Sequence, residues 1–338
     1  MIHIVKTIDA HVGAQPLRLV VEGFPRPLGK TLPLRREWFT KRADAFRRSV
    51  VLPPRGHADM TAAILTEPVS PEAHAGIFFM DAAGYPSMSG HGIIAATTIA
   101  IERGLIFSRE IDHTGARLVF DTPAGTVRAE ARLATRGEAR RVDAVTMTNV
   151  PSFVHAASHP ARVGTRELHV DIAFGGAFYA IVDTETTGIP LLPARLNDLR
   201  RLGADICAVI NTSARPEHPR DASLAGVAGV IFTGPPQDPE AHLRNVTVSS
   251  AGSVDMSAGG TGTSAVMAVL DAMGLLLDGQ AFVHESLTGS LLRGRVVSRT
   301  QLADAPALIT EIEGSAWVTG EHTFFLDDDD PFREGVSF

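Results

Sequence analysis

The chain has 338 residues, 44% hydrophobic and 20% charged, so it can bury a sizeable core and is not expected to be disordered. Its net charge of −7 argues against a basic surface for nucleic acid or an anionic membrane. The single cysteine, Cys207, excludes intrachain disulfides and cysteine-ligated metal centres. The first residues do not resemble a signal peptide, and no uncharged apolar run reaches the ~18 residues of a membrane helix. We therefore expect a cytoplasmic protein.

Most of the chain predicts short strands separated by Gly, Pro and Asp turns. These strands are Ile2–Thr7, Leu17–Val21, Ala62–Leu65, Gly76–Met80, Arg117–Phe120, Gly125–Ala129, Ala144–Asn149, Ala177–Val182, Val227–Phe232 and Arg244–Val248. Two longer apolar segments, Ile93–Gly104 and Ser264–Gly279, lack a broad polar face, so each predicts a buried helix. The pattern indicates the α+β class, with strands dominating.

The two predicted helices follow similar glycine-rich headings, Ser89-Gly90-His91-Gly92 and Gly259-Gly260-Thr261-Gly262. Their first residues lie 170 positions apart, close to half of the 338-residue chain. This spacing predicts a duplicated domain. We place the boundary near Pro151–Thr165, where Pro, Ser, His and Arg replace the strand pattern. The expected domains are residues 1–156, completed by about 318–338, and residues 157–317.

Both headings suit the binding of a small carboxylic acid. A helix N-terminus offers unpaired N–H groups and a partial positive charge, and glycines there let a ligand approach the backbone. If two such ends faced one cleft, the first residue of each heading would point at the ligand from opposite sides. These residues are Ser89 and Gly259.

Six stretches together resemble the proline racemase superfamily, over nearly the whole chain. They are Thr7–His11, Pro54–Met60, Met88–Gly92, Asp171–Gly176, Asp255–Ala265 and Asp329–Phe332. The resemblance implies the diaminopimelate epimerase fold, in which two pseudo-symmetric domains each wrap strands around a central helix and the active site lies in the cleft between them. It also implies cofactor-independent chemistry on a small imino acid. From the composition we expect no nucleic-acid or membrane partner, and the protein partner that we consider is a second copy of the chain, in a homodimer.

The resemblance also assigns roles to residues of both headings. Ser89 stands where the family usually carries a catalytic cysteine, and Gly259 where it usually carries a second Cys or Thr. His91 and Asp255 would hold the ring nitrogen of the substrate. The backbone at Gly90, Gly260 and Thr261 would hold the carboxylate.

The glycine at position 259, where the family usually carries Cys or Thr, distinguishes inversion of the substrate from its dehydration. Inversion at the α-carbon needs a proton donor and an acceptor on opposite faces, and glycine can be neither. In trans-3-hydroxy-L-proline the α-hydrogen and the hydroxyl lie on the same ring face, so catalysis from one face suffices for elimination. We therefore predict dehydration to Δ1-pyrroline-2-carboxylate, with Ser89 as the catalytic residue. The alternative is a 4-hydroxyproline epimerase or proline racemase in which water is the second acid.

A serine hydroxyl needs activation before it can act as a base. The helix dipole contributes at most ~2 kcal/mol, or about one and a half pKa units, which is too little to form an alkoxide at neutral pH. Ser89 therefore needs a general base. His91 is the nearest in sequence, and His57 and His11 are the other candidates.

Structural interpretations compete with each of these roles. Ser89 is also a typical helix N-cap, His91 could be a core histidine, and Asp255 could be a turn residue. The absence of both usual cysteines, with Met256 and Ala258 in place of the usual Arg and Pro, also fits a pseudoenzyme that only binds an amino or imino acid.

Other motifs give weaker evidence of a functional site. Gly260-x-Gly262-x-x-Ala265 fits a dinucleotide fingerprint, but no strand runs directly into it. The acidic run Asp327–Asp330 is more typical of a solvated turn than of a cation site, and the histidines show no metal-binding spacing. Cys207 lies in an apolar segment and is expected to be buried and structural. We expect neither a cofactor nor a metal.

Overall fold

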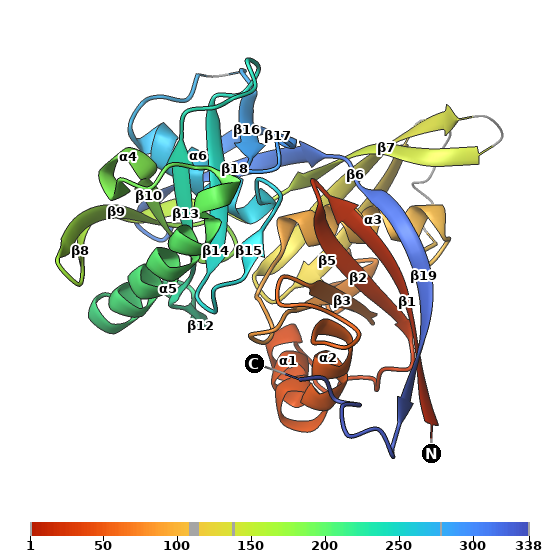
Figure 1. The fold of residues 1–338 in the computed structure, drawn as a ribbon. Helices are drawn as coiled ribbons and strands as arrows, with labels where there is room; N and C mark the ends of the chain where they lie inside the picture. Colours follow the sequence, from red (N-terminus) through yellow and green to blue (C-terminus); the bar gives the residue numbers. More distant parts are fainter. Residues whose placement is uncertain (1, 108–114, 137–138, 278, 337–338) are drawn as a thin grey trace. The chain divides into compact units, whose positions relative to one another are not determined.

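The computed structural model describes residues 2–107, 115–136, 139–277 and 279–336. The chain divides into two compact units (Figure 1). Unit 1 comprises Met1–Met147 together with Gly314–Phe338, and unit 2 comprises Thr148–Glu313. None of the described helices is long and apolar enough to cross a membrane.

Unit 1 contains two short helices, one central helix and most of the N-terminal strands. Its elements are β1 (Ile2–Val12), β2 (Gln15–Glu22), α1 (Leu32–Arg42), α2 (Asp44–Val51), β3 (Thr61–Thr66), β4 (Ala75–Met80), α3 (Gly90–Glu102), β5 (Gly115–Thr122), β6 (Gly125–Arg136), β7 (Ala139–Thr148, whose last residue belongs to unit 2) and β19 (Trp317–Asp327). The C-terminal strand β19 pairs antiparallel with β1, so the two ends of the chain belong to the same unit.

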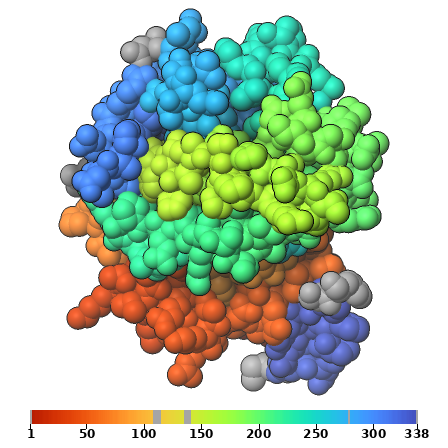
Figure 2. All heavy atoms as spheres, turned by 90° about the vertical axis from the view of Figure 1, so that its left-hand side faces the viewer, coloured from red at the N-terminus to blue at the C-terminus, as the bar shows by residue number. Residues whose placement is uncertain are grey.

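Unit 2 likewise consists of strands and a central helix, with further helices outside it. Its elements are β8 (Phe153–Val163), β9 (Arg166–Phe174), β10 (Phe178–Asp183), α4 (Thr184–Thr187), the 3-10 helix η1 (Pro193–Arg195), α5 (Leu196–Ser213), β11 (Glu217–His218), β12 (Asp221–Ala225), β13 (Val227–Gly234), β14 (Leu243–Ser249), β15 (Val254–Asp255), α6 (Gly260–Ala272), β16 (Phe282–Ser286), β17 (Leu291–Leu302) and β18 (Ala305–Gly314). The amphipathic helix α5 packs against β8, β13 and β14, and its polar side lies at the surface (Figure 2).

The order of strand pairing is the same in both units. In unit 1 the pairs β1–β2, β2–β3, β3–β4, β4–β5 and β5–β6 are alternately antiparallel and parallel. In unit 2 the pairs β9–β10, β10–β13, β13–β14, β14–β16 and β16–β17 follow the same alternation. The second parallel pair of each unit is connected through a central helix, α3 or α6. The predicted duplication therefore appears as a repeated topology.

The central helices are almost completely buried. All residues of α3 except the last two are buried, and so are all residues of α6 except the last three. The strands of its own unit surround each helix: α3 packs on β1, β2, β3, β6 and β19, and α6 on β8, β9, β10 and β17. Because no face of either helix is directed to water, neither shows a polar stripe in its sequence.

The sequence-based boundaries need three corrections. Both helices begin at the second residue of the heading, Gly90 or Gly260, because the glycines from there on are part of the first turn. The second helix ends at Ala272, and the apolar side chains of Met273, Leu275 and Leu277 after it are exposed. The segment Pro151–Thr165, near which we place the domain boundary because it lacks a strand pattern, is largely strand β8, which pairs with β9.

Candidate active site

Ser89 caps the N-terminus of α3. Its backbone is extended (φ −142°, ψ 115°), and its Oγ accepts a hydrogen bond from the Gly92 N–H at 3.1 Å. A β-carbon at Gly92 would lie 2.4 Å from the Phe79 ring, so only glycine fits at this position. The N-cap interpretation of Ser89 is thus correct, and the cap also fixes the hydroxyl, only 8% of the residue being exposed, at the positive end of the helix.

His91 is the histidine that meets Ser89. The Ser89 Oγ lies 3.3 Å from His91 Nδ1 and 3.4 Å from Nε2. An atom equally far from both ring nitrogens is not in line with the lone pair or N–H of either, so neither hydrogen bond is straight. The other two candidate bases accept hydrogen bonds within their own turns: His57 Nδ1 from the Asp59 N–H, and His11 Nδ1 from the Ala14 N–H.

The start of α6 is built differently. Gly259 precedes the helix with φ +71°, a left-handed conformation that side chains rarely adopt, and it provides no side-chain cap. Ser89 and Gly259 occupy equivalent places in the two units, yet their backbones differ as well as their side chains.

Asp255 lies at the end of the short strand β15, opposite Thr247 of β14. Its Oδ1 accepts hydrogen bonds from the Ser257 N–H at 2.9 Å and from the Ser257 hydroxyl at 2.7 Å. Its Oδ2 lies 3.4 Å from the position that a β-carbon of Gly259 would take. Asp255 therefore closes the turn, as the structural interpretation expects, and also directs one oxygen towards the start of α6.

Tyr179 of β10 supports the first turn of α6. Its hydroxyl forms a 2.8 Å hydrogen bond with the Thr261 hydroxyl. The pKa of Tyr179 is raised to about 12, mainly by burial, and the hydrogen bond with Thr261 lowers it while the nearby Asp255 charge contributes to the increase. Tyr179 thus remains a neutral hydrogen-bonding group at physiological pH.

A buried polar cluster holds the carbonyl group of Ala258, just before Gly259. This oxygen accepts hydrogen bonds from Asn245 Nδ2 at 2.9 Å and from the Thr263 hydroxyl at 3.2 Å. The Thr263 hydroxyl also lies 3.0 Å from His284 Nδ1. Burial lowers the pKa of His284 to about 3, so this imidazole is neutral. Because the single hydroxyl proton of Thr263 is donated to Ala258, the hydrogen bond between Thr263 and His284 is donated by the Nδ1–H of the imidazole.

Strand β9 ends against the same helix turn. A β-carbon at Gly175 would lie 2.2 Å from the Thr261 carbonyl oxygen and 2.8 Å from the Ala265 nitrogen. Gly175 therefore allows β9 to approach α6 closely, which gives the family stretch Asp171–Gly176 a structural reason.

The predicted site residues form two groups in the structure. Ser89, Gly90 and His91 lie at the start of α3, and Asp255, Gly260 and Thr261 lie at or just before the start of α6. Sequence reasoning missed four polar residues around α6, which are Tyr179, Asn245, Thr247 and His284. A signal existed for two of them: Asn245 and Thr247 are two residues apart in an apolar strand, and so share one face.

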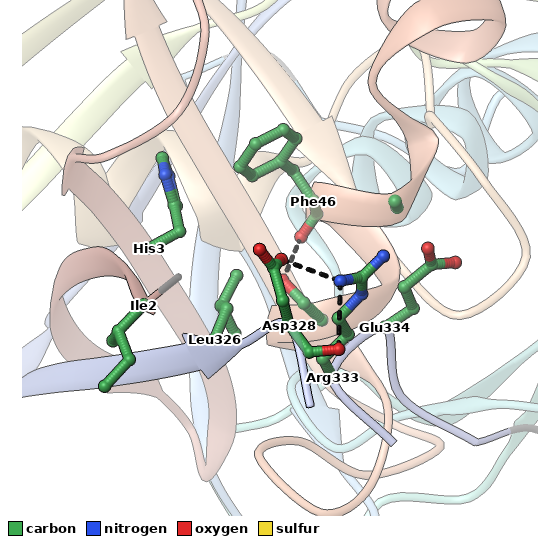
Figure 3. A pocket seen from close by; sticks show the side chains of 9 residues that line it. Ile2, His3, Phe46, Leu326, Asp328, Arg333 and Glu334 are labelled. Atoms are coloured by element: carbon green, nitrogen blue, oxygen red, sulfur yellow. Dashed lines mark hydrogen bonds and ion pairs between the residues drawn. The ribbon is translucent and has the colours of Figure 1, made fainter. Parts of the chain in front are cut away.

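A cavity of about 360 Å³ in unit 1 contains none of the predicted site residues (Figure 3). It is lined by Phe46, Leu326 and charged residues such as Asp328 and Arg333, which form an ion pair at 2.7 Å. The acidic run Asp327–Asp330 is thus a turn closed by its own carboxylates and an arginine. Within the described part of the chain, no three His, Cys, Asp or Glu residues form a group able to hold a metal ion.

Cys207 is buried in α5, and burial raises the pKa of its thiol to about 12. A thiol in this state is not a nucleophile or base at neutral pH. Cys207 does not replace the missing catalytic cysteines.

Known proteins are similar to this chain in sequence and in structure over nearly its full length. The proline racemase family model matches residues 7–337. A trans-3-hydroxy-L-proline dehydratase from Bacillus cereus is 39% identical over 329 residues, which cover 97% of this chain and 96% of the relative. A proline racemase from Clostridioides difficile is 36% identical over 333 residues, covering 98% and 97%.

Among solved structures, a hydroxyproline epimerase from Agrobacterium vitis, crystallised with trans-4-hydroxy-L-proline, superposes with a TM-score of 0.91 and 29% identity. The match covers 99% of this chain and 95% of the epimerase. These relatives are enzymes and include both a lyase and isomerases. The expected α+β, diaminopimelate epimerase-like fold is confirmed. The chain belongs to the proline racemase family.

Proposed function

We propose that this protein is a cofactor-independent hydro-lyase that dehydrates trans-3-hydroxy-L-proline, or a close analogue, to Δ1-pyrroline-2-carboxylate. The observation that carries the proposal is the difference between the two helix starts. One presents a buried hydroxyl at Ser89, and the other has a left-handed glycine, Gly259, with no side chain. A reaction that needs side-chain catalysis from one face only fits this asymmetry.

In the proposed reaction, the two helix starts act on one substrate, as the family resemblance implies. The free N–H groups at Gly90, Gly260 and Thr261 hold the carboxylate, and His91 and Asp255 hold the ring nitrogen. The Ser89 hydroxyl, deprotonated by His91, takes the α-proton. The electron pair of the broken C–H bond forms the C2–C3 double bond as the 3-hydroxyl leaves. The protonated His91 gives its proton to this hydroxyl, which leaves as water, so that Ser89 and His91 return to their starting states. The enamine then tautomerises to the pyrroline.

In this mechanism the His91 ring has to change its orientation. Because the Ser89 Oγ lies equally far from both ring nitrogens, the imidazole has to turn before one nitrogen can accept the serine proton along a straight hydrogen bond. We expect the His91 ring to rotate when the substrate binds at the same helix start.

The alternative function is inversion of the α-carbon of 4-hydroxyproline or proline. Relatives with these names support it, and so do the polar atoms that surround Gly259, among them Asp255 Oδ2 and Thr247 Oγ1. A catalytically inactive binding protein is the remaining possibility.

Proton NMR in D2O, with separate samples of trans-3-hydroxy-L-proline, trans-4-hydroxy-L-proline and L-proline, tests the proposal. We expect pyrroline signals from the first substrate. Ser89→Ala should lower this rate by about 10²–10⁴-fold, the usual contribution of a general base. Binding of pyrrole-2-carboxylate, a planar mimic of the deprotonated ring, should persist in this variant.

Ser49→Ala is the matched control, because Ser49 is also a buried serine of unit 1 and its hydroxyl donates to a backbone carbonyl. Full dehydratase activity in Ser89→Ala would contradict the assigned base. No turnover of any of the three substrates, with pyrrole-2-carboxylate still bound, would instead indicate a binding protein.

A further inference from the structure

The repeat of the two units can be followed residue by residue through a histidine just before β4 and another just before β14. In unit 1 the His74 N–H donates to the Val119 carbonyl oxygen at 2.8 Å, and His74 Nδ1 accepts a hydrogen bond from the Val119 N–H at 3.0 Å. In unit 2, His242 and Val283 form the same two hydrogen bonds, at 2.8 and 2.9 Å. His242 is therefore equivalent to His74, and Val283 to Val119.

Three polar residues of unit 2 stand where unit 1 has apolar residues. We count along the strands from the equivalent histidines and valines, and along each central helix from its first residue. The equivalent pairs are Asn245 and Ile77, His284 and Phe120, and Thr263 and Ile93. All six side chains are completely buried. Unit 1 thus packs apolar side chains at all three positions, so the polar residues of unit 2 are not needed for the fold itself.

The polar residues at these positions also cost stability. Asn245 Oδ1 and His284 Nε2 are buried, and neither has a hydrogen-bond partner among the described residues. A buried polar atom without a partner lowers the free energy of unfolding, whereas apolar groups that fill the same space do not. Polar residues that cost stability, at positions where the other unit has apolar ones, indicate a role in binding or catalysis.

The three residues meet at one backbone group, the carbonyl oxygen of Ala258. Asn245 Nδ2 and the Thr263 hydroxyl donate to it, at 2.9 and 3.2 Å. The Nδ1–H of His284 in turn donates to the Thr263 oxygen at 3.0 Å. We call Asn245, Thr263 and His284 the Ala258 clamp. Because its members are completely buried, they can affect a ligand only through the backbone that they hold.

The Ala258 clamp fixes the peptide group that leads into α6. The nitrogen of the same peptide group is held as well, since the Gly259 N–H donates to Ser257 Oγ at 3.1 Å. The peptide between Ala258 and Gly259 is therefore held at both its oxygen and its nitrogen, and it sets the direction in which the first turn of α6 begins.

The first turn of α6 starts without the side-chain cap that α3 has. In α3 the Ser89 hydroxyl accepts a hydrogen bond from the Gly92 N–H. In α6 the residue before the helix has no side chain, so no cap competes for the N–H groups of Gly260, Thr261 and Gly262. Such groups bind a carboxylate when their N–H bonds point at its oxygens. The direction of this turn therefore decides how well it binds one.

We propose that the Ala258 clamp positions the start of α6 for the carboxylate of the substrate. This inference rests on the proposed function for the binding of an imino acid at this helix start. Asn245, Thr263 and His284 are positioning residues, and the backbone N–H groups after Gly259 are the groups that touch the ligand. If the Ala258 peptide rotated, the hydrogen bonds to the carboxylate would bend together, so affinity would fall although no contact residue had changed.

Calorimetric titration with pyrrole-2-carboxylate tests the Ala258 clamp. Thr263→Val removes the hydroxyl with little change of shape, and we expect binding to weaken about tenfold or more, roughly the value of one hydrogen bond to a charged group. Thr263→Ser retains the hydroxyl and should keep the affinity within about threefold of the wild type. Wild-type affinity in Thr263→Val would overturn the proposal.

NMR spectra of protein with isotope-labelled glycine show where the ligand binds. In the wild type, pyrrole-2-carboxylate should shift the amide signals of Gly260 and Gly262, and at equal occupancy Thr263→Val should reduce both shifts. Ligand-induced shifts at Gly90 without any at Gly260 or Gly262 would place the carboxylate away from α6 and overturn the proposal.

A double variant separates positioning from folding. Thr263→Val/His284→Phe gives unit 2 apolar side chains where unit 1 has Ile93 and Phe120. We expect it to keep the urea midpoint of the wild type while its affinity for pyrrole-2-carboxylate falls about as far as in Thr263→Val. A loss of stability that matches the loss of affinity in both variants would overturn the proposal, because the cluster would then serve folding.

Thr98→Val is the matched control. Thr98 is a buried threonine of α3 whose hydroxyl donates to the Ile94 carbonyl oxygen at 3.0 Å. Its substitution removes a buried hydrogen bond to a backbone carbonyl group, as Thr263→Val does, but away from a helix start. Binding of pyrrole-2-carboxylate should remain at the wild-type level.

Failure of this inference and failure of the proposed function give different results. Dehydration of trans-3-hydroxy-L-proline by the wild type, with full ligand binding in Thr263→Val, would overturn the role of the Ala258 clamp and leave the dehydratase function intact. A wild type that binds pyrrole-2-carboxylate without any turnover, and a Thr263→Val variant that binds it weakly, would contradict the dehydratase function and support the clamp.

Discussion

At the scale of single residues, Ser89 and Gly259 show how far a sequence can be interpreted. The loss of a side chain at Gly259 is visible in the sequence, and so is the hydroxyl of Ser89. The left-handed backbone of Gly259 and the unaligned contact between Ser89 and His91 are not, because they depend on packing around each helix start. The roles of Ser89, His91 and Asp255 in catalysis and binding remain predictions.

Replacing Ser89 by cysteine tests the proposed base directly. A thiol has a reference pKa of ~8.5, and a helix N-terminus lowers it. We expect Ser89→Cys to dehydrate trans-3-hydroxy-L-proline at a rate that rises with pH and levels off below about pH 8.5. The rate should also depend less on His91 than it does in the wild type, which a Ser89→Cys/His91→Gln double variant measures. A folded but inactive Ser89→Cys variant would count against Ser89 as the base.

At the scale of elements, the family stretches that look functional in the sequence divide into two kinds. Some carry site residues, whereas others join elements. Arg55, in the stretch Pro54–Met60, donates hydrogen bonds to the carbonyl groups of Phe332 and Arg333 and so attaches the C-terminal segment to unit 1. Gly175, in the stretch Asp171–Gly176, lets the first turn of α6 pack closely against the end of β9. A motif alone does not separate these two uses.

Gly175→Ala should disturb the site from outside it. The added β-carbon meets backbone atoms of Thr261 and Ala265, which cannot rotate away, so the first turn of α6 has to move. We expect a loss of roughly 1–3 kcal/mol in stability and at least tenfold weaker binding of pyrrole-2-carboxylate. Calorimetric titration and urea unfolding measure the two effects.

Gly164→Ala provides the comparison, since a β-carbon there meets nothing within 4 Å and brings only the strain of its positive φ. Unchanged ligand binding in Gly175→Ala would show that the start of α6 does not depend on this contact.

Among the elements, the buried helices α3 and α6 were predictable because of their length and apolar composition, whereas α1 and α2 were not. In α1 only Leu32 and Phe39 are buried, so its sequence lacks a clear hydrophobic periodicity. The sequence of α5 does show a hydrophobic periodicity. Its buried residues at helical spacing are Leu199, Leu202, Ile206 and Ile210. Of the strands that pack on α6, only β10 was predicted, as Ala177–Val182, whereas β8, β9 and β17 were not. The pairing order could not be predicted either, since it depends on contacts distant in sequence.

At the scale of the whole molecule, stability should depend on pH through His284. Its pKa is about 3 in the folded chain because it is buried, and about 6.5 when unfolded. Between these values the unfolded chain binds a proton that the folded chain does not, so stability falls as the pH falls from about 6.5 towards 3. The slope is about 1.4 kcal/mol per pH unit for one such group.

His284→Gln should flatten this slope, and urea unfolding at pH 6, 5 and 4 measures it for both proteins. The same substitution at the exposed His57 is the control. An unchanged slope in His284→Gln would mean that the imidazole is not buried in its neutral form.

The backbone of Gly259 also bears on how the family can change. One nucleotide change converts a GGT or GGC glycine codon to cysteine or serine, and in an extended segment that change would restore a second catalytic side chain. Here the new β-carbon would arise on a backbone with φ +71°, at a cost of about 1–2 kcal/mol. A second catalytic side chain at this position would therefore carry a backbone cost that Ser89, in its extended segment, does not. The asymmetry of the two repeats is easier to acquire than to reverse.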